Sequence, residues 1–355
     1  MFKKFNIKTE YQPMRKNLDA RLLRDWAARI LMGCGMCDSD ADLAADVLVR
    51  TDLRGYGTHG LVRLGAYCER LRDGSFNARA AMRHTVVPGG IVLDADGAMG
   101  QLAATRAIEL GLDALNDVAS VLVSVRECGH LGALGVYALQ AAEAGAICML
   151  GQRTPPMLSM PGFARPAIGH NPIAFGCPVP DSDPLIVDIA CSVAARGHIL
   201  RAAREGRAIP SDWAVDEGGL PTTDADRALK GALLPMGGHK GLGIAMMMEC
   251  LAGALSGASA DQRKNELTHS GAGGRQGAFC WLVKPGAFIA QDVFFDGMAQ
   301  WTRNYQDLGG EKARVPGSRG AKNERHMLSH GLELPESVIA DLFKLAQATG
   351  IAFPQ

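Results

Sequence analysis

A histidine and an arginine one helical turn apart are the first residues that could do chemistry. The segment Thr58-His59-Gly60 is followed by Arg63. Histidine exchanges protons near neutral pH, and an arginine guanidinium can hold a carboxylate through two parallel hydrogen bonds. Thr58 could orient the imidazole through its hydroxyl. These residues predict a site that moves a proton on a carboxylic acid, although an ordinary surface helix can carry the same pattern.

Two further polar residues adjoin apolar runs that are typical of buried strands. His130 follows the run at 118–126. Ligand sites in α/β proteins often lie at the end of such a strand, so His130 is either a second site residue or a partly buried structural histidine. Asp188 lies inside the run 184–190, where a carboxylate must find hydrogen-bond donors. It could bind a ribose, orient a histidine or cap the next helix.

The glycine-rich segment 237–241 opens an apolar helix and contains His239 and Lys240. Glycines let backbone amides approach an anion at a helix N-terminus, and a lysine adds a point charge suited to phosphate. The segment therefore predicts a phosphate site, or only a glycine-rich helix start with an exposed lysine. No G-x-G-x-x-G follows a strand, and no Walker A loop is present, so the usual dinucleotide-binding unit is not expected.

Other classes of catalytic site find less support. Cys34 and Cys37 have redox spacing, but the pattern around them is helical. No second Cys/His pair completes a zinc site, and no G-x-S-x-G elbow is present. His59, His130, His170 and Asp188 could together bind a metal ion. A metal-dependent hydrolase or lyase is therefore the alternative function from another class, and a metabolite-binding protein without turnover is a third.

The elements that must position these residues follow from apolar periodicity. Helices are expected within 17–50, and a third helix would place His59, Arg63 and Tyr67 on one face. Strands and helices then mix from residue 84 onward, and the tail returns to helix at 334–345. The predicted strands are 84–88, 90–94, 118–126, 146–150 and 184–190, and the predicted helices are 101–116, 135–144, 193–204 and a buried helix at 242–255.

This order predicts an α/β (α+β) protein with a helical domain built from both termini. We expect the helical domain to comprise residues 1–85 and 310–355, and a mixed α/β domain to be inserted between them at 86–309. A chain of 355 residues is long enough for two such domains.

The composition argues against a nucleic-acid partner, a membrane span and secretion. Lys+Arg and Asp+Glu are both 37, so the net charge is zero, which argues against a nucleic-acid partner. The most apolar stretch, 242–255, is short and carries Glu249, so no membrane span is expected. Nine cysteines without a disulfide framework fit a reducing compartment. Because Met1–Tyr11 also lacks the apolar run of a secretory signal, we expect a cytoplasmic protein.

Seven motifs in order resemble one family. They are D-L-R-G-x-x-T-H-G-x-x-R-L at 52–64, G-H-L-G-A-x-G-x-Y-A-L-x-A-A-E-A-G at 129–145, N-P-I-A-F-G at 171–176, V-D-I-A-x-S at 187–192, A-A-R-E-G-R-x-I-P at 202–210, G-A-L-L-P-M-G-G-H-K-G at 231–241 and P-G-S-R-G at 316–320. Between about residues 16 and 345 the chain resembles the malate/L-lactate dehydrogenase-like oxidoreductases, whose cofactor domain is not a Rossmann fold.

The resemblance implies an NAD- or NADP-dependent enzyme that interconverts a small 2-hydroxy acid and its 2-oxo acid. Malate-, lactate- and ureidoglycolate-like acids are the expected substrates, and reduction of a cyclic imine acid is the alternative. It further implies that the helical domain binds substrate and mediates dimerisation, that the inserted domain binds NAD(P), and that the protein is a homodimer.

The resemblance also implies roles for individual residues. The catalytic residues would be His59, His130 and Thr58, with either histidine as the acid–base, and Arg63 and Arg196 would bind substrate. The cofactor would contact Thr154, Asp188, Ile189, Ala190, His239, Lys240, Gly317, Ser318, Arg319 and Gly320. No metal site is implied. The chain departs from the family at Thr58, where serine is common, at Ser318, where glutamate is common, and at His198, which follows a position that is acidic in some members.

Overall fold

The computed structural model describes residues 17–163, 165–258 and 276–354. Met1–Tyr11, where no leader is expected, lie outside this part of the chain. The helices are α1 (Ala20–Met32), α2 (Asp38–Leu53), α3 (Leu64–Arg72), α4 (Gly100–Ala114), α5 (Gly135–Glu143), α6 (Arg196–Arg204), α7 (Ala225–Lys230), α8 (His239–Met248), α10 (Gln291–Gly309), α11 (Ser318–His330) and α12 (Glu336–Thr349). The mixed α/β class predicted from the sequence is confirmed.

Seven strands form the central sheet, in the order β2-β3-β4-β12-β5-β8-β9. They are β2 (Arg83–Val87), β3 (Gly90–Asp94), β4 (Ser120–Cys128), β12 (Gln276–Val283), β5 (Ile147–Gln152), β8 (Ile173–Cys177) and β9 (Leu185–Ile189). Only β3 and β4 pair in parallel, and the other neighbours are antiparallel. The sheet therefore lacks the parallel, doubly wound order of a Rossmann unit.

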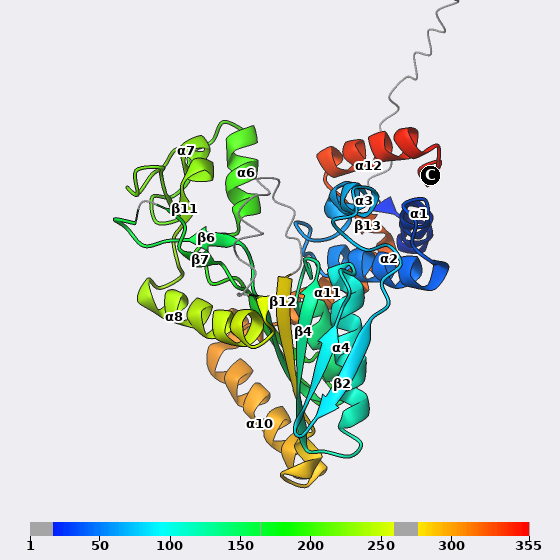
Figure 1. Cartoon of the computed structure of the whole chain (residues 1–355). Helices are drawn as coiled ribbons and strands as arrows, with labels where there is room; N and C mark the ends of the chain where they lie inside the picture. The colour runs from blue at the N-terminus through cyan, green and yellow to red at the C-terminus, as the bar shows by residue number, and fades with distance from the viewer. Residues whose placement is uncertain (1–16, 164, 259–275, 355) are drawn as a thin grey trace, which may run out of the picture.

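Helices from both ends of the chain gather beside the sheet. Figure 1 shows α1, α2, α3 and α12 in one upper corner, with β1 (Asn17–Leu18) paired antiparallel to β13 (Leu332–Glu333). Asp19 caps α1 by accepting hydrogen bonds from the backbone nitrogens of Arg21 and Leu22. One buried apolar core runs from these helices through α4 and α5 to the sheet. The domain limits expected from the sequence stay predictions.

A small lobe stands on the other side of the sheet (Figure 1). Its four-stranded sheet has the order β10-β11-β6-β7, formed by Ala214–Val215, Ala232–Leu233, Pro156–Leu158 and Ile168–Gly169. Helices α6 and α7 pack on it, and its apolar core is separate from the main one. The strands and helices of the lobe come from residues between β5 and α8, and Ala245 of α8 also joins its core.

The segment 242–255 differs from its prediction as a buried helix. Helix α8 continues into a π-helical turn, Glu249–Ala254, which packs against β12 and β5. Its other side faces outward, and Met247 is 60% exposed. Apolar residues all round a helix predict burial from sequence, but here only one side meets the sheet.

The predicted helical face that carries His59, Arg63 and Tyr67 is also wrong in part. Only Tyr67 lies in α3, Arg63 lies in the 3₁₀ turn Leu61–Arg63, and His59 precedes that turn. Gly60 explains the break, because a Cβ at this position would overlap the carboxylate of the buried Asp52. The chain can therefore enter the turn only with glycine there.

Candidate active site

His59 lies in a turn that is held from two sides. Its Nδ1 is 2.8 Å from Thr58 Oγ1, and Arg63 Nε donates a hydrogen bond to the Thr58 carbonyl oxygen at 2.8 Å. Gly197, at the start of α6, lies against Thr58, since a Cβ there would be 3.3 Å from Thr58 Cγ2. The small lobe thus meets the helical corner beside His59.

His130 follows β4 and faces His59, with 5.7 Å between the ring centroids. Tyr67 Oη lies 2.9 Å from His130 Nδ1. The backbone on either side of His130 is held by one side chain: Gln152 Nε2 donates to the Gly129 carbonyl at 2.9 Å, and Gln152 Oε1 accepts from the Leu131 nitrogen at 3.0 Å. The ring is therefore fixed from the sheet side.

His170 is a third half-buried histidine, in electrostatic range of the other two. Its Nδ1 is 3.1 Å from Thr154 Oγ1. Burial lowers the pKa of His59 and of His170 to about 4, and the cationic Arg63 also lowers that of His59. Burial, with His59 and Arg63, holds the pKa of His130 well below its usual range. All three imidazoles are therefore neutral near pH 7, and Arg63 supplies the positive charge among them.

Asp188 lies near the end of β9. Its Oδ2 accepts a hydrogen bond from the backbone nitrogen of Gly135 at 2.7 Å. Of the three roles open in the sequence, the structure therefore shows a helix cap, but of α5 and not of the following helix. Burial raises the pKa of the Asp188 carboxyl to about 6, against this hydrogen bond.

The start of α11 adjoins Asp188 and offers donors for a nucleotide. Pro316 accepts a hydrogen bond from the Ile186 nitrogen at 3.0 Å, which places Gly317 and the first residues of α11 beside β9. Tyr56 is in electrostatic range of Asp188, Arg319 and Arg54. These groups combine cations, helix-start amides and a carboxylate within one small region.

Arg54 provides the test of whether a phosphate-bearing cofactor fits. Its guanidinium is buried, stacks on Gly320 and donates from Nη2 to the Gly317 carbonyl at 3.4 Å. Its Nη1 pairs with Glu324 Oε2 at 2.6 Å, and its Nε has no hydrogen-bond partner in the described part of the chain. A buried unpaired donor beside a helix N-terminus suits an anion, and the Asp188 carboxylate suits ribose hydroxyls. The residues present therefore fit a nicotinamide dinucleotide.

His239 and Lys240 begin α8, after Gly237 and Gly238, whose φ values of 58° and 62° are those of glycine. Both side chains are exposed. The preceding Met236 nitrogen bonds to the Cys191 carbonyl at 2.9 Å, so this helix start lies beside the chain that continues from Ile189 and Ala190. A role for His239 and Lys240 in binding a cofactor phosphate stays a prediction.

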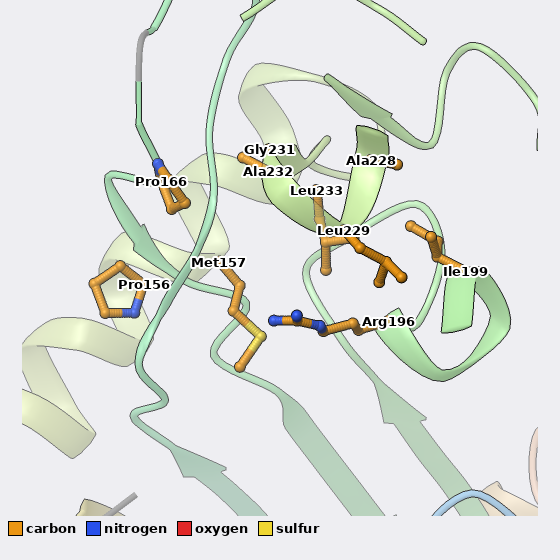
Figure 2. A pocket seen from close by; sticks show the side chains of 10 residues that line it. All are labelled: Pro156, Met157, Pro166, Arg196, Ile199, Ala228, Leu229, Gly231, Ala232 and Leu233. Atoms are coloured by element: carbon orange, nitrogen blue, oxygen red, sulfur yellow. The ribbon is translucent and has the colours of Figure 1, made fainter. Parts of the chain in front are cut away.

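The two remaining predicted site residues are Thr154, which contacts His170, and Arg196, which belongs to the small lobe. Thr154 is 2% exposed, and its hydroxyl contacts His170 and Asn171. Arg196 lines a cavity of about 40 Å³ inside the small lobe. Figure 2 shows its side chain extending toward Met157, below Leu229 and Leu233. A role for Thr154 in cofactor binding and for Arg196 in substrate binding stays a prediction.

Reasoning from the sequence missed several residues of this site. The sequence pattern places Tyr67 only as a neighbour of Arg63, and it assigns no role to Gln101 or Gln152. Both glutamines are polar residues in otherwise apolar stretches, which is the signal that could have found them. His170 was considered only as a metal ligand. Among the residues that the structure describes, no three His, Cys, Asp or Glu side chains gather as ligands for an ion. No helix there is long and apolar enough to cross a membrane.

Comparison with known proteins first shows the class of protein to which this chain belongs. A Delta(1)-pyrroline-2-carboxylate/Delta(1)-piperideine-2-carboxylate reductase of Pseudomonas aeruginosa is 31% identical over 339 residues, covering 94% of this chain and 100% of its own. The NAD(+) ureidoglycolate dehydrogenase of Escherichia coli is 31% identical over 314 residues, covering 87% and 89%. An NADP(+) (2R)-3-sulfolactate dehydrogenase of Chromohalobacter salexigens is 30% identical over 334 residues, covering 93% and 98%. The chain is thus an oxidoreductase.

The chain belongs to the malate/L-lactate dehydrogenase family, whose sequence model matches residues 18–343. This confirms the resemblance inferred from the seven motifs. The crystal structure of a malate dehydrogenase from Entamoeba histolytica superposes with a TM-score of 0.88 over 96% of this chain and all of that one. At 24% identity this likeness shows the shared fold.

Proposed function

We propose that the protein interconverts a small 2-hydroxy acid and the corresponding 2-oxo acid, with NAD or NADP as cofactor. The observation that carries the proposal is the pair of facing neutral histidines, His59 and His130, beside Arg63. A neutral imidazole can accept the hydroxyl proton of an acid during oxidation and return it during reduction.

Arg63 would bind the carboxylate of the acid. Its Nε donates a hydrogen bond to the Thr58 carbonyl oxygen, and this bond fixes the plane of the guanidinium. In the described chain no side chain bonds its two terminal nitrogens, so both can point at one carboxylate. Thr58 positions both groups, because its hydroxyl contacts His59 and its carbonyl holds Arg63. The reacting carbon is thereby kept close to the histidines.

The cofactor would be held by the two helix starts beside β9. The amides at Gly317–Gly320, with Arg319 and Arg54, and those at His239–Lys240 would bind phosphates, while Asp188 would bind a ribose. Ile189 and Ala190 would make apolar contacts with the cofactor. Thr154 would act through His170, which its hydroxyl contacts. A bound nicotinamide cofactor would supply the hydride chemistry at C2 of the acid. Every other part of the reaction, including the proton transfer, falls to the protein.

The test is a panel of 2-oxo acids with NADH and NADPH, followed at the nicotinamide absorbance band. Turnover of at least one acid is expected, with kcat lowered about 100-fold or more in whichever of His59→Ala and His130→Ala removes the acid–base. His84→Ala, on the exposed strand β2, is the control and should behave as wild type. The proposal is wrong if no acid turns over and calorimetry shows no cofactor binding.

Reduction of a cyclic imine acid is the second candidate. The P. aeruginosa reductase, which aligns over its whole length, favours it. An imine acid carries the same carboxylate for Arg63, but its ring nitrogen replaces the oxygen that meets a histidine. Including Δ¹-piperideine-2-carboxylate in the panel separates the two: the higher kcat/KM identifies the substrate class.

We also propose that the protein is a cytoplasmic homodimer. The outer face of the central sheet carries a cavity of about 270 Å³ lined only by apolar residues, among them Met149, Phe175 and Met247. Trp281, on strand β12 of the same sheet, is 44% exposed. An apolar surface of this kind is typical of an interface. The nine cysteines are free thiols, which suits a reducing cytoplasm.

A further inference from the structure

The ring of His130 is connected to a second layer of buried polar side chains. Tyr67 Oη lies 2.9 Å from His130 Nδ1, and Gln101 Nε2 lies 3.3 Å from Tyr67 Oη. Tyr67 and Gln101 are both buried, and they belong to α3 and α4. The three side chains form a short line that ends at His130 Nδ1.

The orientation of the Gln101 amide follows from its other neighbour. Its Nε2 is also 3.5 Å from the Leu131 carbonyl oxygen, which already accepts a hydrogen bond from Tyr137 Oη at 2.6 Å. A flipped amide would set its oxygen against this carbonyl oxygen, and two acceptors repel. The amide therefore presents NH₂ to both Tyr67 and Leu131. In this orientation Gln101 Oε1 is buried without a partner in the described chain.

The direction of the remaining hydrogen bond follows from this orientation. Gln101 donates to the Tyr67 oxygen, so it cannot accept the hydroxyl proton of Tyr67. In the described part of the chain the acceptor within reach of that proton is His130 Nδ1. A neutral imidazole with an accepting Nδ1 carries its proton on Nε2.

We propose that Gln101 is a positioning residue that acts through Tyr67 to hold His130 as the tautomer protonated at Nε2. The inference rests on the proposed function for its consequence. A substrate oxygen that approaches Nε2 meets an N–H donor, which suits the carbonyl oxygen of a 2-oxo acid. The hydroxyl proton of a 2-hydroxy acid finds no lone pair there until the tautomer changes. The free enzyme is thus prepared to bind the 2-oxo acid, whose carbonyl oxygen accepts a hydrogen bond from Nε2.

The first test reads the tautomer without any substrate. The protein is labelled with ¹⁵N-histidine, and the two ring nitrogens of His130 are assigned by their absence in His130→Asn. A protonated Nε2 and an unprotonated Nδ1 are expected at pH 7.5. A proton on Nδ1 in the wild-type protein overturns the inference, whether or not the enzyme turns over the acids of the panel. Conversely, the expected spectrum without turnover contradicts the proposed function alone.

The second test changes Gln101. Gln101→Met keeps the length of the side chain and removes the donor, and Gln101→Glu replaces the donor with an acceptor for the Tyr67 hydroxyl. Gln101→Glu should move the His130 proton to Nδ1, and both variants should lower kcat for reduction by roughly 10- to 100-fold, with KM for the acid within about threefold of wild type.

The matched control is Thr105→Val. Thr105 lies one turn further along α4, and its hydroxyl is also buried without a partner in the described chain. This variant should leave both the spectrum and kcat unchanged. Unchanged His130 spectra in Gln101→Glu would overturn the assignment, as would an equal loss of kcat in Thr105→Val. If Gln101→Met does not fold, the wild-type spectrum still decides.

Discussion

Asp52 Oδ2 accepts a hydrogen bond of 2.7 Å from the backbone nitrogen of Leu61, nine residues further along the chain. This bond ties the end of α2 to the 3₁₀ turn that carries Arg63. The Asp52 carboxyl is buried, and burial raises its pKa to about 7. The turn that places His59 and Arg63 therefore depends on a carboxyl group that is costly to ionise.

The first prediction concerns pH and stability. Because the folded-state pKa of Asp52 lies above its unfolded value, the folded protein binds this proton more tightly, and stability falls as pH rises from about 4 to about 7. Asp52→Asn removes the charge and can still accept from Leu61. It should gain stability relative to wild type, on the order of a few kcal/mol at pH 8 and much less at pH 4. Urea unfolding at both values measures it, and a gain that does not depend on pH contradicts the assignment.

The histidines of the site predict the opposite dependence of stability on pH, over an overlapping range of pH. His59 and His170 have folded-state pKa values of about 4, below their unfolded values, so the unfolded chain binds more protons between about 4 and 6.5. Their contribution to stability is therefore lost as pH falls through that window. Between pH 7 and pH 5 the stability of His170→Gln should therefore fall less than that of the wild-type protein. The urea midpoints at the two pH values measure this difference. An identical slope in the two proteins would show that His170 is not buried in its neutral form.

Gly60 should not tolerate a side chain. In Gly60→Ala the new Cβ would overlap the Asp52 carboxylate, so the turn must shift, at a cost of about 1–3 kcal/mol. The control is Gly65→Ala in α3, where a Cβ meets nothing within 4 Å and helix propensity favours alanine by up to about 1 kcal/mol. Thermal unfolding of both variants gives the comparison. Equal melting temperatures would mean that Gly60 is not confined as described.

Two substitutions separate the two roles of Asp188, which are to cap α5 and to bind the dinucleotide. Asp188→Ala loses the cap of α5 and should cost about 1 kcal/mol of stability, whereas Asp188→Asn keeps an acceptor for the Gly135 nitrogen. Both variants lose the charge and should bind the dinucleotide about tenfold more weakly. Calorimetric Kd values test this point. Wild-type affinity in Asp188→Asn would remove Asp188 from the cofactor site.

The apolar outer face of the sheet predicts a dimer that charge can break. Met247→Lys places an ammonium group beside the cavity that Met149 and Phe175 line, and it should convert the protein to a monomer. Val86→Lys, on the exposed strand β2, adds the same charge elsewhere and should leave the mass unchanged. Light scattering on a sizing column distinguishes the two. A monomeric wild-type protein would refute the homodimer outright.

Sequence periodicity predicts α4, β4 and α5 to within a few residues, because each is one apolar run with a clear end. The network around His130 has no such pattern. Tyr67, Gln101 and Gln152 come from three separate elements, and only the tertiary fold brings them to one ring. The prediction of a helix at His59 is wrong for a related reason: the spacing of the residues is helical, but the distant Asp52 carboxylate decides the path of the turn.

The last helix of the chain supports the turn near its beginning. Helix α12 packs against α3 and the turn Leu61–Arg63, and β13 pairs with β1. During synthesis the first helices leave the ribosome long before α12 does, so a growing chain holds Arg63 without its final support. A chain that stops before α12 therefore lacks the contacts that hold this turn in the folded protein.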